Sequence, residues 1–296
     1  MSLEDRQTMR RKAFKKGLDT DDARRRREDE AVVLRKQQKD AALMKKRFMS
    51  ENMDPQLNSQ PANSAAIAVD TCGAQDQFSI PELASQLSGG DLDAQLVVTQ
   101  KLRKILSVQD NPPIAEVVAA GVTHKFVEFL GMHAKPDLQF ESAWVLTNIA
   151  SGTSDQTEHV VDAGALPACI RLLTSENTDV REQAVWAIGN ISGDSTKHRD
   201  HVLSIGGLPP LLSIIMQSTK ISMLRNTMWA VSNLFRGRPF ADARHVRLAL
   251  PALVRLLDMA TDDEVITDCC WCLSYMADGE SLHGINSVVQ SGVIPR

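Results

Sequence analysis

WAIGNISGD at residues 186–194 is one of four segments that align with one another without a gap. The other three are WVLTNIASG (144–152), WAVSNLFRG (229–237) and WCLSYMADG (271–279). Their tryptophans follow one another at intervals of 42, 43 and 42 residues. A second series recurs in step with them, around Gly121, Gly164, Gly207, Ala249 and Gly292. Two independent series with one period are not expected by chance, so the chain is built from repeats.

The length of the repeat indicates the fold class. A period of 42–43 residues is typical of helical repeat proteins of the armadillo and HEAT kinds. One such unit cannot bury its apolar face alone, so successive units stack into a superhelix with a long concave surface. We therefore expect an all-α fold, a right-handed armadillo-repeat superhelix (solenoid), preceded by a basic N-terminal segment.

Each unit is expected to contain three helices. A short helix ends at a glycine, a second helix opens with a proline, and the Trp-bearing helix follows a polar turn. Asp179 with Glu182, and Thr261 with Glu264, have the spacing of capping boxes at the start of the third helix. One atypical unit, at about residues 80–108, precedes the four units with complete Trp-bearing helices.

Charge and composition divide the chain into three parts. The first 50 residues carry 16 Lys and Arg against 9 Asp and Glu, a net charge of +7, while the remainder carries −11. A helix as polar as residues 1–49 has too little apolar surface to pack on a core, so we expect it to fold only on a partner. Residues 50–77 are rich in Pro, Asn, Ser and Gln and are predicted to form a flexible linker. Residues 78–296 hold the repeats.

The tryptophans are predicted to lie on the polar side of their helices. With Trp186 at zero, Asn190 lies at about 40°, Gln183 at about 60° and the apolar Ile188 at about 200° around the helix. The equivalent pairs are Trp144 with Asn148, Trp229 with Asn233, and Trp271 with Tyr275. A lone helical tryptophan is usually a core residue, but four on the polar side predict a ladder of exposed indoles.

Such a ladder predicts a particular ligand. Asparagine amides both donate and accept hydrogen bonds, so a row of them suits the backbone of an extended peptide. Indole faces attract cations and aliphatic stems, and interleaved Asp and Glu receive ammonium or guanidinium groups. Neighbouring helices about 10 Å apart match roughly three residues of extended chain. The ligand predicted by this surface is an extended stretch rich in Lys and Arg.

Other functional classes have little support in the sequence. We expect no enzyme and no cofactor, because no phosphate loop, GxSxG or HExxH motif is present. Cys269, Cys270 and Cys272 lie on one predicted helix, which cannot close a tetrahedral metal site. No apolar run approaches the roughly 20 residues of a membrane helix, and no secretory signal is visible. The run Arg24–Arg27 alone would also fit a solvated helix face or an arm that binds nucleic acid.

Together, the WxxxN ladder and the preceding RRRRxxxxxxLRKxxKDxxxxKKR resemble importin α, the armadillo-repeat adaptor that recognises nuclear localisation signals (NLS). The resemblance covers essentially the whole chain. It implies an adaptor that is not an enzyme, that shuttles between cytoplasm and nucleus, and that is monomeric within a complex of importin β and cargo, without nucleic acid, membrane or metal. The NLS-binding residues that it implies are Trp144, Asn148, Gly152, Thr157, Gln183, Trp186, Asn190, Asp194, Asn226, Trp229, Asn233, Glu264, Asp268 and Trp271.

The resemblance also implies two functions for the basic segment. In the family this segment, the importin β-binding (IBB) domain, binds importin β as a helix and otherwise lies in the adaptor's own groove. The implied importin β-binding residues are Arg24, Arg25, Arg26, Arg27, Arg35, Lys36 and Lys39. The implied autoinhibitory residues are Lys45, Lys46 and Arg47.

The chain departs from the family where it stops. At Arg296 the second helix of a further repeat should begin, and family members carry more repeats. We therefore expect a fragment or incomplete product, with any second groove and any export-receptor site beyond Arg296. Two alternatives remain open: an armadillo scaffold of adhesion or signalling, whose groove would bind acidic ligands, and a nucleic-acid binder that uses its N-terminal arm.

Overall fold

The structure is a computed structural model that describes residues 79–108, 111–278 and 282–295. All of these belong to one unit, Gln75–Arg296. The predictions for the basic segment (1–49) and the linker (50–77) lie outside the described residues, and so do all the residues predicted to bind importin β or to inhibit the chain.

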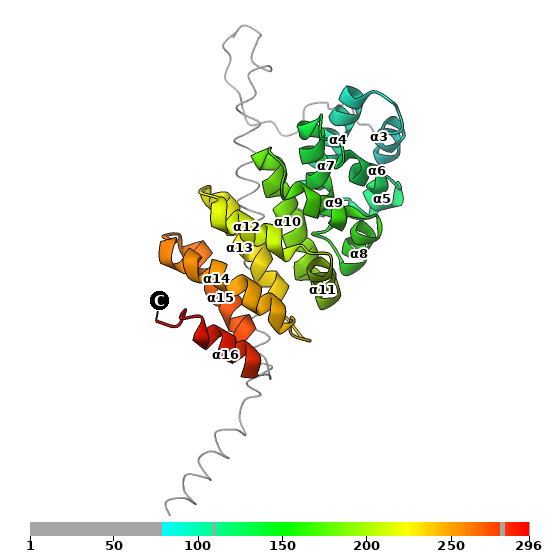
Figure 1. Cartoon of the computed structure of the whole chain (residues 1–296). Coiled ribbons are helices and arrows are strands. Elements are labelled where there is room, and N and C mark those ends of the chain that lie inside the picture. Colours follow the sequence, from blue (N-terminus) through cyan, green and yellow to red (C-terminus); the bar gives the residue numbers. More distant parts are fainter. Residues whose placement is uncertain (1–78, 109–110, 279–281, 296) are drawn as a thin grey trace, which may run out of the picture. The chain divides into compact units, whose positions relative to one another are not determined.

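The described part of the chain is built of helices, without strands, as the repeat predicts (Figure 1). The helices are α3 (Ile80–Gln86), α4 (Leu92–Leu106), α5 (Ile114–Ala119), α6 (Thr123–Phe129), α7 (Pro136–Ile149), α8 (Ser154–Asp162), α9 (Ala165–Leu172), α10 (Thr178–Asp194), α11 (Thr196–Ser204), α12 (Leu208–Gln217), α13 (Ile221–Phe235), α14 (Ala243–Met259), α15 (Asp263–Ala277) and α16 (Leu282–Gln290). The expected all-α solenoid is confirmed.

Three successive units have the predicted three helices: α5–α7, α8–α10 and α11–α13. The third helix of each unit is the one that carries the tryptophan, and these helices pack side by side in the order α7, α10, α13, α15, with α4 packed against α7 at the start of the row. In Figure 1 the colours accordingly follow one another along the row of helices. The repeat of the sequence thus becomes one continuous layer of Trp-bearing helices.

The fourth unit differs from the prediction, because its first two helices are fused into α14. In the other units a glycine separates them in the left-handed conformation, with φ of 72°, 84° and 80° at Gly121, Gly164 and Gly206. A side chain rarely adopts that conformation, so glycine ends the helix there. The aligned residue of the fourth unit is Leu248, which favours helix, and α14 continues through Pro251.

The predicted capping boxes of the third helices are wrong by one or two residues. The N-cap of α10 is Asn177, whose side chain accepts from the backbone N–H of Asp179 at 2.9 Å. The N-cap of α15 is Asp262 rather than Thr261, and it accepts from Val265 N–H at 3.2 Å. Asn and Asp are at least as good N-caps as Thr. Glu182 and Glu264, which were expected to complete the capping boxes, instead contact residues of the neighbouring Trp-bearing helix.

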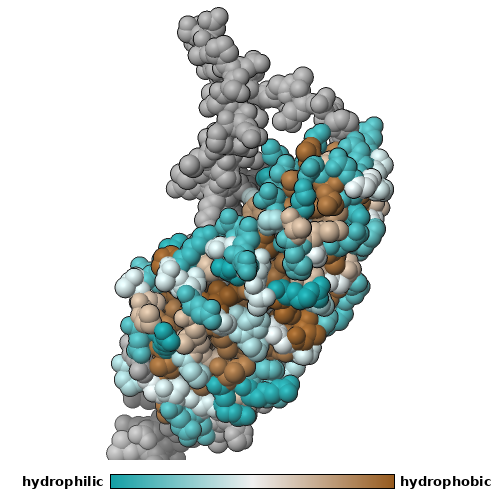
Figure 2. All heavy atoms as spheres, turned by 45° about the horizontal axis from the view of Figure 1, so that its top comes forward, coloured by the Kyte–Doolittle hydropathy of each residue, from teal (hydrophilic) through white to brown (hydrophobic). Residues whose placement is uncertain are grey.

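A continuous apolar core runs through the repeats and includes Phe126, Leu146, Ile188, Val231 and Leu253. Several large apolar side chains also reach the surface, among them Val97, Leu248 and Met259, and Figure 2 shows hydrophobic residues exposed among hydrophilic ones. None of the described helices is long and apolar enough to span a membrane.

Candidate functional site

The indoles of Trp144, Trp186 and Trp229 are buried, with 4–6% of each residue exposed. The prediction of exposed indoles is therefore wrong for these three, and Trp271 is only half-buried. The apolar core cluster of the described residues does not include the three buried indoles, whereas Trp271 packs against it. The helical-wheel prediction thus failed on the exposure of these indoles.

Packing between neighbouring repeats explains the burial. The rings of Trp186 and Trp229 lie 6.2 Å apart between centroids and are tilted by 58°. The Trp229 ring covers Gly189 of the preceding repeat, where a Cβ atom would collide with it. Within α7 itself, Phe140 also meets the Trp144 ring edge-on at 5.4 Å. A helical wheel treats one helix alone, so it cannot show that the next helix covers an indole.

The asparagines of the ladder connect each repeat to the preceding one. Asn190 Nδ2 donates to the backbone carbonyl of Thr147 at 3.1 Å, and Asn233 Nδ2 donates to that of Gly189 at 3.0 Å. Asn148 Nδ2 donates to Ser107 Oγ at 3.2 Å. Among the described residues, the second amide hydrogen and the Oδ1 of Asn190 and Asn233 have no partner. Each of these two amides therefore retains one donor and one acceptor.

Polar residues beside the ladder are also cross-linked between repeats. Gln183 Nε2 donates to Thr147 Oγ1 at 2.9 Å, and Asn226 Nδ2 donates to Glu182 Oε1 at 3.2 Å. Lys220 Nζ lies 2.8 Å from the other oxygen of Glu182 and 3.2 Å from Asp179. The carboxylates at this edge are thus already paired with one internal cation.

The acidic residues of the fourth unit face an internal arginine. Arg225 lies 2.6 Å from Asp262 and 2.9 Å from Glu264, one of the predicted NLS-binding residues. Asp268 is 1% exposed, and the Trp271 ring stacks on Tyr275 at 5.8 Å between centroids. Glu264, Asp268 and Trp271 thus share α15, and Glu264 among them is paired with a cation from α13.

At the other end of the ladder, Arg103 of α4 shows how this surface holds a cation. Its guanidinium carbon lies 4.5 Å from the centroid of the Trp144 ring, and its Nε is 2.9 Å from Glu141 Oε2. Arg103 and Glu141 are both buried. An indole and a carboxylate from the same turn of α7 thus bind a guanidinium together. The sequence gave no sign that Arg103 would meet this pair.

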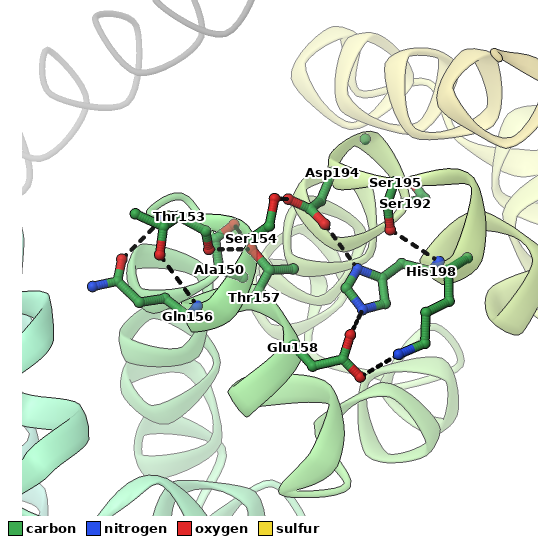
Figure 3. A network of polar contacts seen from close by, with 12 residues as sticks. Ala150, Thr153, Ser154, Gln156, Thr157, Glu158, Ser192, Asp194, Ser195 and His198 are labelled. Atoms are coloured by element: carbon green, nitrogen blue, oxygen red, sulfur yellow. Dashed lines mark hydrogen bonds and ion pairs between the residues drawn. The ribbon is translucent and has the colours of Figure 1, made fainter.

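Asp194 lies at the last residue of α10, within a polar network (Figure 3). Its Oδ1 accepts from Ser154 Oγ at 2.8 Å, and its Oδ2 lies 3.0 Å from Nδ1 of His198. The Nε2 of the same imidazole lies 3.0 Å from Glu158 Oε2, and Lys197 Nζ is 2.6 Å from Glu158 Oε1. The sequence predicted Asp194 but missed Ser154, Glu158 and His198 as its neighbours.

Gly152 and Thr157 flank Ser154, the residue of this segment that contacts Asp194. Thr157 is buried, and its hydroxyl donates to the Ala150 carbonyl at 3.2 Å and to Thr153 O at 3.3 Å (Figure 3). A Cβ at Gly152 would meet the end of the Gln156 side chain. Gln156 in turn accepts from Thr153 N–H, closing the capping box of α8.

The cysteines do not form a metal site in the described part of the chain, where no group of three or more His, Cys, Asp or Glu could hold an ion. Cys269 and Cys272 are buried and Cys270 is exposed. Burial raises the pKa of Cys169 and Cys269 to about 12, so these thiols remain protonated.

Comparison with known families covers both parts of the chain. The model of the importin beta binding domain matches residues 10–100, and the armadillo/beta-catenin-like repeat matches residues 110–151, 153–193, 195–236 and 246–278. The repeat matches end close to the ends of the Trp-bearing helices α7, α10, α13 and α15. The two models together therefore extend from residue 10 to residue 278.

Curated relatives are similar over nearly the whole chain. Importin subunit alpha-4 of Arabidopsis thaliana is 46% identical over 293 residues, 98% of this chain and 54% of the relative. Importin subunit alpha-1a of Oryza sativa subsp. japonica is 47% identical over 292 residues, 99% of this chain and 54% of the relative. The chain thus spans about half the length of the curated relatives it matches.

Solved structures agree with the fold. A designed armadillo repeat protein in complex with the peptide (KR)4 is 27% identical with a TM-score of 0.66, covering 74% of this chain and 90% of that one. A second, computationally designed for modular peptide recognition, is 25% identical with a TM-score of 0.66, covering 73% and 90%. With its repeats, its N-terminal domain and its relatives in agreement, the chain belongs to the importin α family of armadillo-repeat proteins.

Proposed function

We propose that this chain is a nuclear import adaptor that binds extended, Lys/Arg-rich nuclear localisation signals and docks to importin β. The signal lies along the Trp/Asn ladder of α7, α10 and α13, and the basic N-terminal segment binds importin β. The protein would accordingly shuttle between cytoplasm and nucleus. The relatives named importin subunit alpha support this assignment for the half of their length that the chain spans.

The observation that carries the proposal is the internal cation site at Arg103. There the Trp144 indole and the Glu141 carboxylate together hold a guanidinium. A positive side chain over an indole face gains cation–π attraction, and a carboxylate adds a charge-assisted hydrogen bond. Trp186 and Trp229 repeat the indole on the next two helices, with Asp194 at the end of α10. An indole and a carboxylate are the two kinds of group that we propose a basic ligand contacts along these helices.

The asparagines supply the second element of recognition. The Oδ1 and one amide hydrogen of Asn190 and of Asn233 have no partner among the described residues, and they suit the N–H and C=O groups of an extended backbone. Backbone pairing does not depend on sequence, while the indoles and carboxylates select positive charge. A designed armadillo repeat protein in complex with (KR)4 supports this ligand class.

The match of residues 10–100 to the importin beta binding domain supports the second contact. The residues predicted to bind importin β, Arg24–Arg27, Arg35, Lys36 and Lys39, lie within this range. We further propose that Lys45, Lys46 and Arg47 occupy the ladder of their own chain when importin β is absent. A tethered segment has a high effective concentration, so modest intrinsic affinity suffices for self-inhibition. Importin β would then raise cargo affinity by removing the competitor.

Binding of the peptide (KR)4 by calorimetry tests the ladder. The double variant Asn190→Ala with Asn233→Ala should lower its affinity at least about tenfold, since two hydrogen-bonding positions are lost. Asn286→Ala, an exposed asparagine of α16, is the matched control and should bind as the parent does. Equal affinity of the double variant and the control, or tighter binding of an acidic octapeptide, would contradict the proposal.

Capture by immobilised importin β tests the N-terminal contact. Changing Arg24, Arg25, Arg26 and Arg27 to Ala should abolish capture, whereas the Asn190→Ala, Asn233→Ala variant should be captured fully. Retention of the quadruple variant would refute the assignment of this segment. Tight binding of residues 1–50 to duplex DNA would instead favour a nucleic-acid arm.

A further inference from the structure

Both oxygens of the Asp194 carboxylate are held from neighbouring helices (Figure 3). Ser154 of α8 donates to Oδ1 at 2.8 Å, and Nδ1 of His198 in α11 lies 3.0 Å from Oδ2. The Asp194 side chain is 12% exposed. Two contacts from two helices fix its orientation at the end of the ladder.

The His198 ring bridges two carboxylates. Its side chain is 3% exposed, with Nδ1 facing Asp194 and Nε2 facing Glu158 at 3.0 Å. Glu158 of α8 and Asp194 of α10 belong to one repeat, whereas His198 of α11 belongs to the next, so the ring joins two repeats. Hydrophobic packing alone would not place both ring nitrogens against acids.

The protonation state of the ring decides whether one or both carboxylates accept a hydrogen bond from it. A neutral imidazole has one N–H and donates to one of the two, while an imidazolium donates to both. Glu158 also accepts from Lys197 at 2.6 Å, a contact that lowers the pKa of Glu158 and keeps it ionised. Glu158 thus already has a donor in Lys197, whereas the Oδ2 of Asp194 depends on the ring. The single proton of a neutral ring is therefore best placed on Nδ1, towards Asp194.

Few other charged groups face the ring. Lys197 lies on its own helix and is paired with Glu158, while Arg199 is directed to Asp200 and to the carbonyls of residues 236, 237 and 239. From the end of α13, Arg236 Nη2 donates to the Gly193 carbonyl at 2.9 Å, next to Asp194. None of these groups titrates between pH 5.5 and 8 at its ordinary pKa.

We propose that His198 is a positioning residue for Asp194: its Nδ1–H orients the carboxylate, and its charge state sets how strongly Asp194 attracts a ligand ammonium group. The proposal rests on the function proposed above. An imidazolium at 3.0 Å neutralises part of the Asp194 charge. The neutral ring keeps the orienting hydrogen bond and leaves the full negative charge to the ligand. Affinity for a lysine-containing ligand should therefore rise as pH increases.

The test measures the affinity of a lysine-rich octapeptide at pH 5.5, 6.5, 7.2 and 8.0. The background is the full chain with Lys45, Lys46 and Arg47 changed to Ala, which removes an internal competitor that would respond to pH in the same way. The peptide lysines and the carboxylates do not titrate in this window at their ordinary pKa values. With His198 present, affinity should increase about threefold from pH 5.5 to 8.0, as expected for one charge beside a partly exposed ion pair.

Two variants separate charge from orientation. His198→Asn retains a donor near the Nδ1 position without a titrating group, so it should bind with the parent's pH 8.0 affinity at every pH. His198→Leu has neither, so it should be equally independent of pH but bind about threefold more weakly than His198→Asn. Circular dichroism at each pH confirms that all three chains are folded.

The outcomes distinguish the two proposals. If His198→Asn keeps the parent's pH dependence, or His198→Leu binds as tightly as His198→Asn, the role of His198 is overturned while peptide binding by the ladder stands. If the background chain does not bind the octapeptide even at pH 8.0, the proposed function fails, and this inference fails with it.

Discussion

Asn233 donates a hydrogen bond to the backbone carbonyl of Gly189, 44 residues earlier, with 3.0 Å between the atoms. The same pair of helices is joined by the Trp229 ring, which lies against Gly189. The ladder is therefore part of the interface between repeats as well as a candidate ligand surface. Mutations there should affect both stability and binding, and the two effects have to be measured separately.

Gly189→Ala tests the contact between α10 and α13. The new Cβ collides with the Trp229 indole, so the ring must move, and we expect a loss of about 1–3 kcal/mol in the free energy of unfolding. Urea denaturation measures it. Gly90→Ala, where nothing lies within 4 Å of the added Cβ, is the control and should stay within about 0.5 kcal/mol of the parent. Equal stability of the two variants would show that the packing of the Trp229 indole does not require a glycine at position 189.

Arg199 is predicted to hold the loop after α13. It is 1% exposed and donates to the carbonyls of Arg236, Gly237 and Pro239. Arg199→Met keeps the stem but leaves these acceptors without their donor, so unfolding should become easier by about 3 kcal/mol. The exposed Arg171→Met serves as the reference and should be nearly neutral. A small effect at both positions would refute this role.

Asp262 should make stability depend on acid pH. Its hydrogen bond to Arg225 lowers the pKa of this carboxyl, with a backbone hydrogen bond from Val265 adding to the effect. The pKa of an aspartate in the unfolded chain is about 3.9, and a carboxyl whose pKa is lower in the folded state stabilises the fold at pH values above that. This contribution is lost as the pH falls through the pKa of the folded state. The solvent exposure of Arg225 limits the contribution to about 1 kcal/mol or less.

Asp262→Asn isolates the charge, because asparagine caps α15 equally well. The free energy difference between parent and variant should be largest at pH 6–7 and should shrink below about pH 4. Chemical denaturation across that range measures it. A difference that stays constant down to pH 2.5 would contradict the assigned ion pair.

Self-inhibition predicts a gain of affinity. Changing Lys45, Lys46 and Arg47 to Ala should tighten binding of (KR)4 by about tenfold, because a tethered competitor is removed. Changing Arg10, Arg11 and Lys12 to Ala removes the same charge from another part of the segment and should have a smaller effect. Equal gains would indicate a general charge effect, and no gain would exclude self-inhibition by this cluster.

The helices were predictable because their signals are local and recur. Tryptophan spacing, glycines and prolines give the units directly, and the fusion of α14 follows from Leu248 standing where the other units have a left-handed glycine. The predicted caps failed because Asn177 and Asp262, one or two residues away, cap equally well or better. Local rules do not choose between adjacent candidates of equal quality.

The site was predicted less completely. The helical wheel and the family resemblance together named Trp186, Asn190 and Asp194 as candidates, but exposure depends on the neighbouring repeat, which covers the indoles. His198 and Glu158 are 40 residues apart, close to one repeat, so the period would place them in adjacent units. Nothing in either segment indicated that the two side chains turn towards each other.

The most direct test of the central claim is where a basic peptide contacts the chain. A (KR)4 peptide with a photoreactive benzophenone at its centre can be cross-linked to the full chain, and the attachment sites mapped by mass spectrometry. We predict cross-links in α7, α10 and α13, which are lost when unlabelled peptide is added in excess. Cross-links confined to α9, α12 or α14 would contradict the assignment of the Trp/Asn ladder as the peptide-binding surface.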